Sequence, residues 1–199
     1  MTEKIEKRHK ALREKLVDIA EQRIAADGIE AVKARDLAKT AECALGAIYN
    51  VFDDIREIIL IVNGRTFRRL GDAVQHDLAG RVNTSPTERL ITIANAYLDF
   101  AVENTNLWRS LFDIPFSSDL NAPQWYWNEL DRLFQYIAGP VDECYAQMSD
   151  TDRTLMTRAL FSSVHGIVSF GIENRAAPVA RDELERMIEL IIIGVSGNK

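Results

Sequence analysis

The stretch "RDLAKTAECALGAIYNVFDDIRE", residues 35–57, decides how this chain folds. Its apolar residues recur at intervals of three and four, as they do along one face of a helix. The pattern predicts a short helix at 34–41, a turn, and a further helix at 44–52. Together with a helix before them, these elements predict helix-turn-helix geometry.

The last helix of such a unit can lie in the major groove of DNA. Ile48 and Phe52 stand four residues apart and are expected to face the two preceding helices. The opposite face then carries an amide for base edges, small apolar groups for thymine methyls, a phenol for phosphate and a glycine for close approach. These residues are Ala44, Leu45, Gly46, Ala47, Tyr49 and Asn50. A hairpin buried in an all-α core allows the same pattern, so periodicity alone leaves both interpretations open.

The rest of the chain reads as helices too. A first helix is expected to end at "ADGI", because Gly28 suits the position after a helix. Asp54 and Glu57 form a variant capping box that opens a long helix to about Leu78. Further helices are expected at 87–103, 106–113, 124–147, 150–174 and 181–195, with a break at 80–86, a loop at 114–123 and a kink at Gly139–Pro140. The fold prediction is an all-α chain of about nine helices, with a head of residues 1–55 and a second domain of residues 56–199.

Charge is unevenly placed along the chain. The net charge is −6, yet the first 16 residues hold six basic and three acidic side chains. A basic leading edge permits a polyanion contact at the N-terminal end, although a solvated helix face has the same composition. No apolar run approaches the roughly 18 residues of a membrane span, and the N-terminus lacks the apolar core of a signal peptide. We therefore expect a cytoplasmic protein without a membrane partner, with Cys43 and Cys144 as unpaired thiols.

Residues 28–59, "GIEAVKARDLAKTAECALGAIYNVFDDIREII", resemble the DNA-binding signature of the TetR family of bacterial repressors. The resemblance rests on Gly28, "RDLA" at 35–38, Ala41, Gly46, Ile48, Tyr49, Phe52 and Glu57. With about nine helices in 199 residues it extends over the chain length. It implies a double-stranded DNA operator, a homodimer and a small-molecule effector, and it adds Lys33, Arg35 and Arg56 to the candidate DNA contacts.

The chain departs from the family pattern at several positions. Val32 and Lys33 stand where the family usually has Thr or Ser, and Ile55 stands where a lysine is usual. The turn, usually Gly-Val-Ser, reads Glu42, Cys43 and Ala44 here. A missing hydroxyl cap costs about 1 kcal/mol, and phosphate repels a carboxylate. These departures leave the strength of DNA binding open. Phosphate contacts from Lys33, Arg35, Lys39 and the arm of Lys7, Arg8 and Lys10 would compensate, although a structural ion pair is an equal alternative for Arg35.

A second resemblance lies in "LFSSVHGIVSF", residues 160–170, which is similar to one TetR subgroup with a Trp-His-Gly motif. Phe161 stands near the place of the tryptophan, and His165–Gly166 are kept. The resemblance implies that the last two helices pair with their copies in a second subunit. The candidate dimer contacts are Ser162, Gly166, Ser169, Ile188, Ile191 and Ile192; the alternative is that both helices are intrachain core.

Aromatic residues concentrate between residues 97 and 136. Grouped around a kinked helix with one histidine, they predict a pocket for a small apolar or aromatic ligand, while ordinary core packing is the alternative. The candidate ligand contacts are Tyr97, Trp108, Phe112, Trp125, Tyr126, Phe134, Phe161 and His165.

The leading hypothesis is a transcriptional repressor that a ligand releases from a palindromic operator. The alternative is a helical ligand-binding or interaction protein on a TetR scaffold whose DNA binding is weakened. An enzyme is not expected, because the sequence shows no phosphate-binding glycine loop, zinc motif or nucleophile elbow. No cofactor and no metal are expected either.

Overall fold

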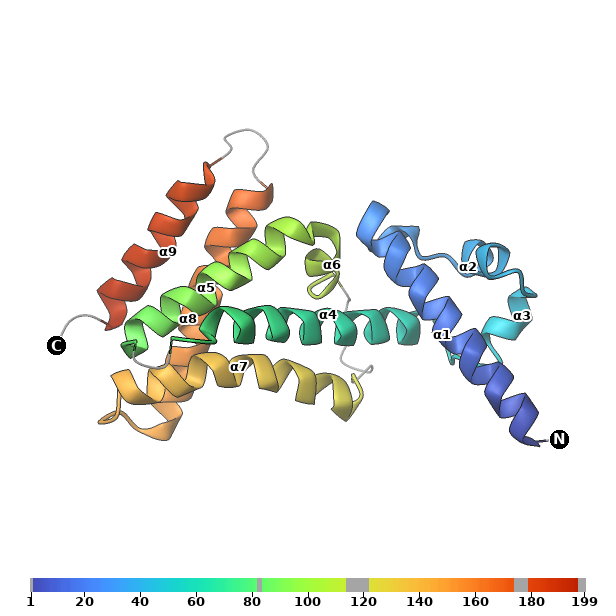
Figure 1. Ribbon diagram of the computed structural model, residues 1–199, viewed down its shortest axis with the longest axis horizontal. Helices are drawn as coiled ribbons and strands as arrows, with labels where there is room; N and C mark the ends of the chain where they lie inside the picture. Colours follow the sequence, from blue (N-terminus) through green and yellow to red (C-terminus); the bar gives the residue numbers. More distant parts are fainter. Residues whose placement is uncertain (1, 82–83, 114–121, 174–178, 197–199) are drawn as a thin grey trace. The chain divides into compact units, whose positions relative to one another are not determined.

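The computed structural model describes residues 2–81, 84–113, 122–173 and 179–196 (Figure 1). Within these ranges it contains nine α-helices, one short 3-10 turn and no strand, so the predicted all-α class is confirmed. The predicted loop at 114–123 lies mostly outside the described residues, as do two residues of the predicted break at 80–86. The helices are α1 (Thr2–Asp27), α2 (Ala34–Ala41), α3 (Leu45–Ile48), α4 (Ile55–Leu78), α5 (Pro86–Glu103), α6 (Thr105–Ser110), α7 (Gln124–Cys144), α8 (Asp150–Glu173) and α9 (Arg181–Ser196).

The chain forms two compact units. The first contains Met1–Phe67 and Asn104–Trp127, and the second contains Arg68–Glu103 and Asn128–Lys199. The helices α4 and α7 each have one part in the first unit and the other part in the second. The predicted head of residues 1–55 lies wholly in the first unit, where α6 adds Leu107 to the core of the head.

The predicted end of the first helix and the predicted start of the long helix each have a distinct backbone or hydrogen-bond geometry. The helix α1 ends at Asp27, and Gly28 follows with φ 82° and ψ 178°, a conformation that is open essentially to glycine alone. At the start of α4, the Asp54 carboxylate accepts a hydrogen bond of 2.8 Å from the Glu57 N–H. The Glu57 carboxylate accepts a hydrogen bond of 2.9 Å from the Asp53 N–H. This is the reciprocal bond of a capping box, made here to the residue before Asp54.

In the second unit, α5, α8 and α9 pack on one another (Figure 1). The helix α8 packs tightly on α9 at Gly171, where an added Cβ would lie 2.5 Å from Leu184 Cδ1. A side chain at this position would require Leu184 to move, so glycine suits the contact as it stands. The helix α7 continues through Gly139 and Pro140 as one element.

One helix among the described residues has the length and composition of a membrane span. Asp150–Ile172 of α8 has a mean hydropathy of 1.3. A helix that lies in a core or at a subunit interface has the same composition, so this alone does not indicate a membrane.

Candidate functional site

The head places α2, a turn and α3 in helix-turn-helix order. Ile48 is fully buried and Phe52 is 3% exposed, so both anchor the segment in the core as predicted. The helix α3 is shorter than the predicted 44–52, because regular helix ends at Ile48. The chain then continues as hydrogen-bonded turns, with Phe52 N–H donating to Ile48 O at 2.9 Å.

The outward face of this segment holds most of the predicted DNA-reading residues. Leu45 is 41% exposed and Tyr49 is 53% exposed, so both side chains are accessible to a partner. Ala44, Gly46 and Asn50 are also exposed, and Ala47 is half-buried. A Cβ added at Gly46 would meet nothing within 4 Å, so the backbone there is open to a partner. The structure brings these residues together on one face; their contact with DNA stays a prediction.

The turn between α2 and α3 has a conformation that its sequence does not favour. Glu42 has φ 56° and ψ 43°, the left-handed region. Cys43 N–H donates to Ala38 O at 3.0 Å, which gives a Schellman-type end to α2, where glycine is usual. Ala44 then begins α3 without a side-chain hydrogen bond. Glu42 therefore carries a backbone cost, and it places a negative charge in the turn.

The basic residues of the head divide into two groups. Lys33 and Arg35 are exposed at the start of α2, whereas Arg56 is half-buried in the first turn of α4. In α1, by contrast, Arg13 and Lys15 bond to residues outside their own helix: Lys15 Nζ donates to Ala41 O at 2.8 Å, and Arg13 donates to Val51 O and pairs with Glu57. Charge counting had placed both with the basic leading edge. Arg13 is half-buried and Lys15 is exposed, so only their bonds to residues far along the chain separate them from the other cations of α1.

Four of the predicted ligand residues form an aromatic cluster in the second unit. The Tyr97 hydroxyl and His165 Nδ1 share a hydrogen bond of 2.8 Å. Phe161 stacks on the His165 ring at 5.7 Å between centroids and an interplanar angle of 19°. Phe161 also contacts Tyr97 at 5.9 Å and Phe134 at 5.1 Å, both edge to face. The cluster joins α5, α7 and α8 around one polar pair.

The other four predicted ligand residues belong to the first unit. Trp108 is 1% exposed and contacts Phe112 at 5.5 Å, while Tyr126 is 2% exposed. Burial raises the pKa of the Tyr126 phenol, and a hydrogen bond with Asn63 acts in the opposite direction. Trp125, 38% exposed, lies against Tyr126 at 5.8 Å. The sequence prediction grouped eight residues that the structure divides equally between two units.

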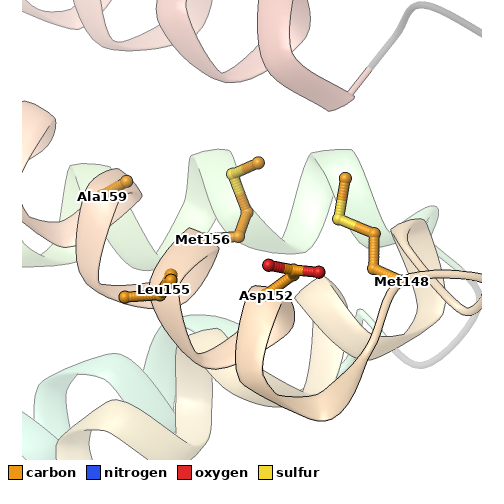
Figure 2. Close-up of a pocket in the computed structure, with 5 residues that line it drawn as sticks. All are labelled: Met148, Asp152, Leu155, Met156 and Ala159. Atoms are coloured by element: carbon orange, nitrogen blue, oxygen red, sulfur yellow. The ribbon is translucent and has the colours of Figure 1, made fainter.

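A shallow groove lies on α8 in the second unit (Figure 2). Met148, Asp152, Leu155, Met156 and Ala159 line it, and none of these is a predicted ligand residue. Figure 2 shows the two methionine side chains pointing to the same side, with the Asp152 carboxylate between them. The groove is therefore largely apolar and opens next to the exposed side chain of Leu155.

The predicted dimer residues are split between surface and core. Ser162 and Gly166 are exposed, Ser169 is half-buried and Ile191 is 41% exposed. Ile188 and Ile192 are 0% and 2% exposed within the single chain, so their side chains belong to the intrachain core. Their burial fits the alternative of an intrachain core for these two side chains, and a contact with a second subunit stays a prediction for the set as a whole. The large apolar residues that remain exposed on the two helices are Leu155, Phe170, Met187, Leu190, Ile191, Ile193 and Val195.

No group of three or more His, Cys, Asp or Glu residues suited to a metal ion occurs among the described residues. Neither Cys43 nor Cys144 forms a disulfide, and both are half-buried.

The fold and the head define a helix-turn-helix protein with a separate helical domain. Residues 90–192 match the family described as "Tetracyclin repressor-like, C-terminal domain", and this chain belongs to that family. No curated protein matches the sequence.

Several solved structures share the fold at low sequence identity. A protein of unknown function from Rhodococcus sp. RHA1 is 19% identical, with a TM-score of 0.74 over 93% of this chain and 95% of that one. The transcriptional regulator FadR from Bacillus subtilis, in complex with stearoyl-CoA, is 18% identical, with a TM-score of 0.69 over 90% and 97%. A regulator from Saccharomonospora viridis described as putative, in complex with choline, is 20% identical, with a TM-score of 0.65 over 92% and 96%.

Proposed function

We propose that this chain is a cytoplasmic, homodimeric repressor of transcription that a small apolar or aromatic ligand releases from a palindromic DNA operator. The single observation that carries the proposal is the exposed face of α3. Leu45, Tyr49 and Asn50 point outward from a segment that Ile48 and Phe52 anchor in the core. A soluble protein gains nothing by exposing such side chains together unless a partner covers them.

The dimer rests on the outward side of α8 and α9. Leu155 and Phe170 are more than half exposed on α8, as is Leu190 on α9, and Ile191 adjoins it. Gly166, with open space around it, allows a second helix to approach closely. An isologous contact through these helices would place two copies of α3 on successive turns of one DNA face. The apolar composition of α8 then reflects a subunit interface and not a membrane.

The proposed ligand site is the cluster of Tyr97, Phe134, Phe161 and His165. It offers aromatic faces around one hydrogen-bonded pair, which suits an apolar ligand with a single polar group. The ligands of the FadR and Saccharomonospora viridis structures support a ligand role for this kind of domain without indicating which ligand this chain binds. Ligand binding would lower operator affinity only if the ligand prefers the form of the dimer that binds DNA poorly.

The test is a mobility-shift titration of the purified dimer against the DNA upstream of its own gene, at low salt and without ligand. Specific binding that competitor DNA does not remove is expected. Asn50→Ala and Tyr49→Phe should weaken it, since each removes a polar group from the exposed face. Absence of any specific shift, with the dimer intact by sedimentation, would contradict the repressor.

The turn favours a second candidate, in which this scaffold binds a ligand or protein and holds DNA weakly. Glu42 is exposed in a left-handed conformation, and Ala44 provides no cap. Ile55 packs against the core of the head, so a lysine there would exchange packing for charge. Restoring a hydroxyl with Ala44→Ser and a cation with Ile55→Lys should raise DNA affinity sharply if this candidate is correct. An unchanged affinity would favour the first.

A further inference from the structure

The helix α1 holds both ends of the segment that carries α3. We call residues 42–52 the reading segment. Immediately before it, Ala41 O accepts a hydrogen bond of 2.8 Å from Lys15 Nζ. At its far end, Val51 O accepts one from the Arg13 guanidinium. Two cations that stand two residues apart on one helix therefore bind backbone carbonyls close to the two ends of the reading segment.

Arg13 makes three different contacts at its end of the segment. Besides Val51 O, its guanidinium pairs with the Glu57 carboxylate at the start of α4. The guanidinium carbon also lies 4.2 Å from the centroid of the Phe52 ring, which places the cation over the aromatic face. A planar fork can satisfy all three at once, whereas the point charge of a lysine cannot.

The reading segment has little means of holding its own shape. The helix α3 is a single turn, and a helix of that length is unstable by itself. Ala44 offers no side-chain cap at its start, and Glu42 occupies a left-handed position before it. The hydrogen bonds from Lys15 and Arg13 near the two ends of the segment therefore supply stabilisation that its own residues do not provide.

We infer that Arg13 and Lys15 are positioning residues for DNA recognition. They fix the orientation of α3 through the backbone near the two ends of the reading segment, and they do not contact DNA themselves. Their loss should therefore reduce discrimination between DNA sequences and leave the attraction to phosphate unchanged. This rests on the proposed DNA-binding function. It also separates these two cations from the predicted phosphate contacts of the arm, Lys7, Arg8 and Lys10, because their charged groups bond to Ala41, Val51 and Glu57.

Hydrogen–deuterium exchange of the full chain tests the positioning role without DNA. The variant is Arg13→Gln with Lys15→Gln, and the matched control is Lys10→Gln, an exposed cation of the same helix. Faster exchange is expected in peptides that include residues 42–52, with the second unit unchanged and the control equal to wild type. Unchanged exchange in the reading segment would overturn the inference. If hydrogen exchange in the double variant is faster throughout the chain, the single variant Arg13→Lys is measured in its place. It keeps the positive charge and loses the planar guanidinium, so faster exchange confined to residues 42–52 is again the expected result.

The ratio of specific to non-specific DNA affinity is the second measurement, because a residue that only stabilises the fold would not change this ratio selectively. A duplex that the wild-type chain selects from a random pool is compared with poly(dI-dC). The double variant should bind the selected duplex at least about tenfold more weakly, from the lost charge-assisted bonds, while its affinity for poly(dI-dC) stays the same. Its salt slope should also match wild type, whereas Lys10→Gln should lower the slope by about 0.9 if Lys10 meets a phosphate. A reduced slope in the double variant would overturn the inference. Failure of wild type to select any duplex would count against the proposed function alone, because hydrogen exchange still decides the positioning role.

Discussion

Asn63 of α4 and Ser110 of α6 exchange two hydrogen bonds of 2.7 Å, and neither residue is exposed to solvent. Asn63 Nδ2 donates to the Ser110 carbonyl, and the Ser110 hydroxyl donates to Asn63 Oδ1. Tyr126, at the start of α7, hydrogen-bonds Asn63 as well. One amide thus joins three helices inside the first unit. Such a buried polar group is tolerated only while each of its atoms keeps a partner.

Asn63→Ala should lower the free energy of unfolding by about 2–4 kcal/mol, because it removes both hydrogen bonds with Ser110 and opens a small void. The Ser110 hydroxyl keeps Leu107 O as an acceptor, whereas the Ser110 carbonyl loses the Asn63 amide. Asn50→Ala, at an exposed asparagine, is the matched control and should change stability by less than about 0.5 kcal/mol. Urea denaturation of both variants measures the difference. Equal losses would show that the buried pair contributes nothing particular.

Glu42→Gly should raise the stability of the head by about 1 kcal/mol, because glycine adopts the left-handed conformation of this position without the steric cost of a Cβ. It should also raise DNA affinity by removing a negative charge beside the reading face. Glu42→Gln separates the two effects, since it removes the charge and keeps the backbone strain. Thermal melting and mobility shifts together measure them, and a destabilised glycine variant would contradict the backbone argument.

Gly28→Ala and Gly46→Ala should act in opposite directions. At Gly28, with φ 82° and ψ 178°, alanine should cost roughly 1–3 kcal/mol, although no atom would clash with its Cβ. At Gly46, inside α3, alanine should add up to about 1 kcal/mol of helix stability. The same alanine should weaken DNA binding if the backbone approaches DNA there. Calorimetry and mobility shifts of the two variants check both expectations.

Leu190→Glu should convert the dimer to monomers without unfolding the chain, because Leu190 is 55% exposed on α9. Ile188→Ala on the same helix is the contrasting variant. Its side chain is fully buried, so it should lower stability by about 2–5 kcal/mol and leave subunit association to the exposed face. Sedimentation velocity and urea denaturation distinguish the two. A Leu190→Glu dimer as tight as wild type would place the interface elsewhere.

Ser85→Ala should raise the pKa of Glu88 part of the way toward its ordinary value of 4.5. The pKa is lowered by the hydrogen bond from the Ser85 N–H, at 2.8 Å, and next by that from its hydroxyl, at 2.9 Å, of which alanine removes only the second. Because the folded pKa is below the unfolded one, the stabilisation is present above pH 4.5 and is lost as pH falls through the folded value. Carboxyl NMR titration of wild type and variant measures the shift; identical curves would rule out a role for the hydroxyl.

The helical pattern of the sequence was sufficient for the fold. Ile48 and Phe52, four residues apart, predict their own burial, and Asp54 with Glu57 predicts the start of α4, because both depend on neighbours within one or two turns. The exposed reading face follows from the same periodicity. The departures at Glu42 and Ala44 could also be read directly, since the residue types themselves disagree with the turn they occupy.

Contacts between distant residues were decided by tertiary structure. Periodicity shows that Ile188, Ile191 and Ile192 lie near one another on α9, but only packing against α5 and α8 buries the first and third and leaves Ile191 exposed. Aromatic density cannot divide Tyr97 from Trp108, because membership of a unit depends on how the chain crosses between units. In the same way, a count of charges treats Arg13 as one basic residue among several. Its bonds to Val51 and Glu57 join residues far apart in sequence, and such partners meet only when the chain has folded.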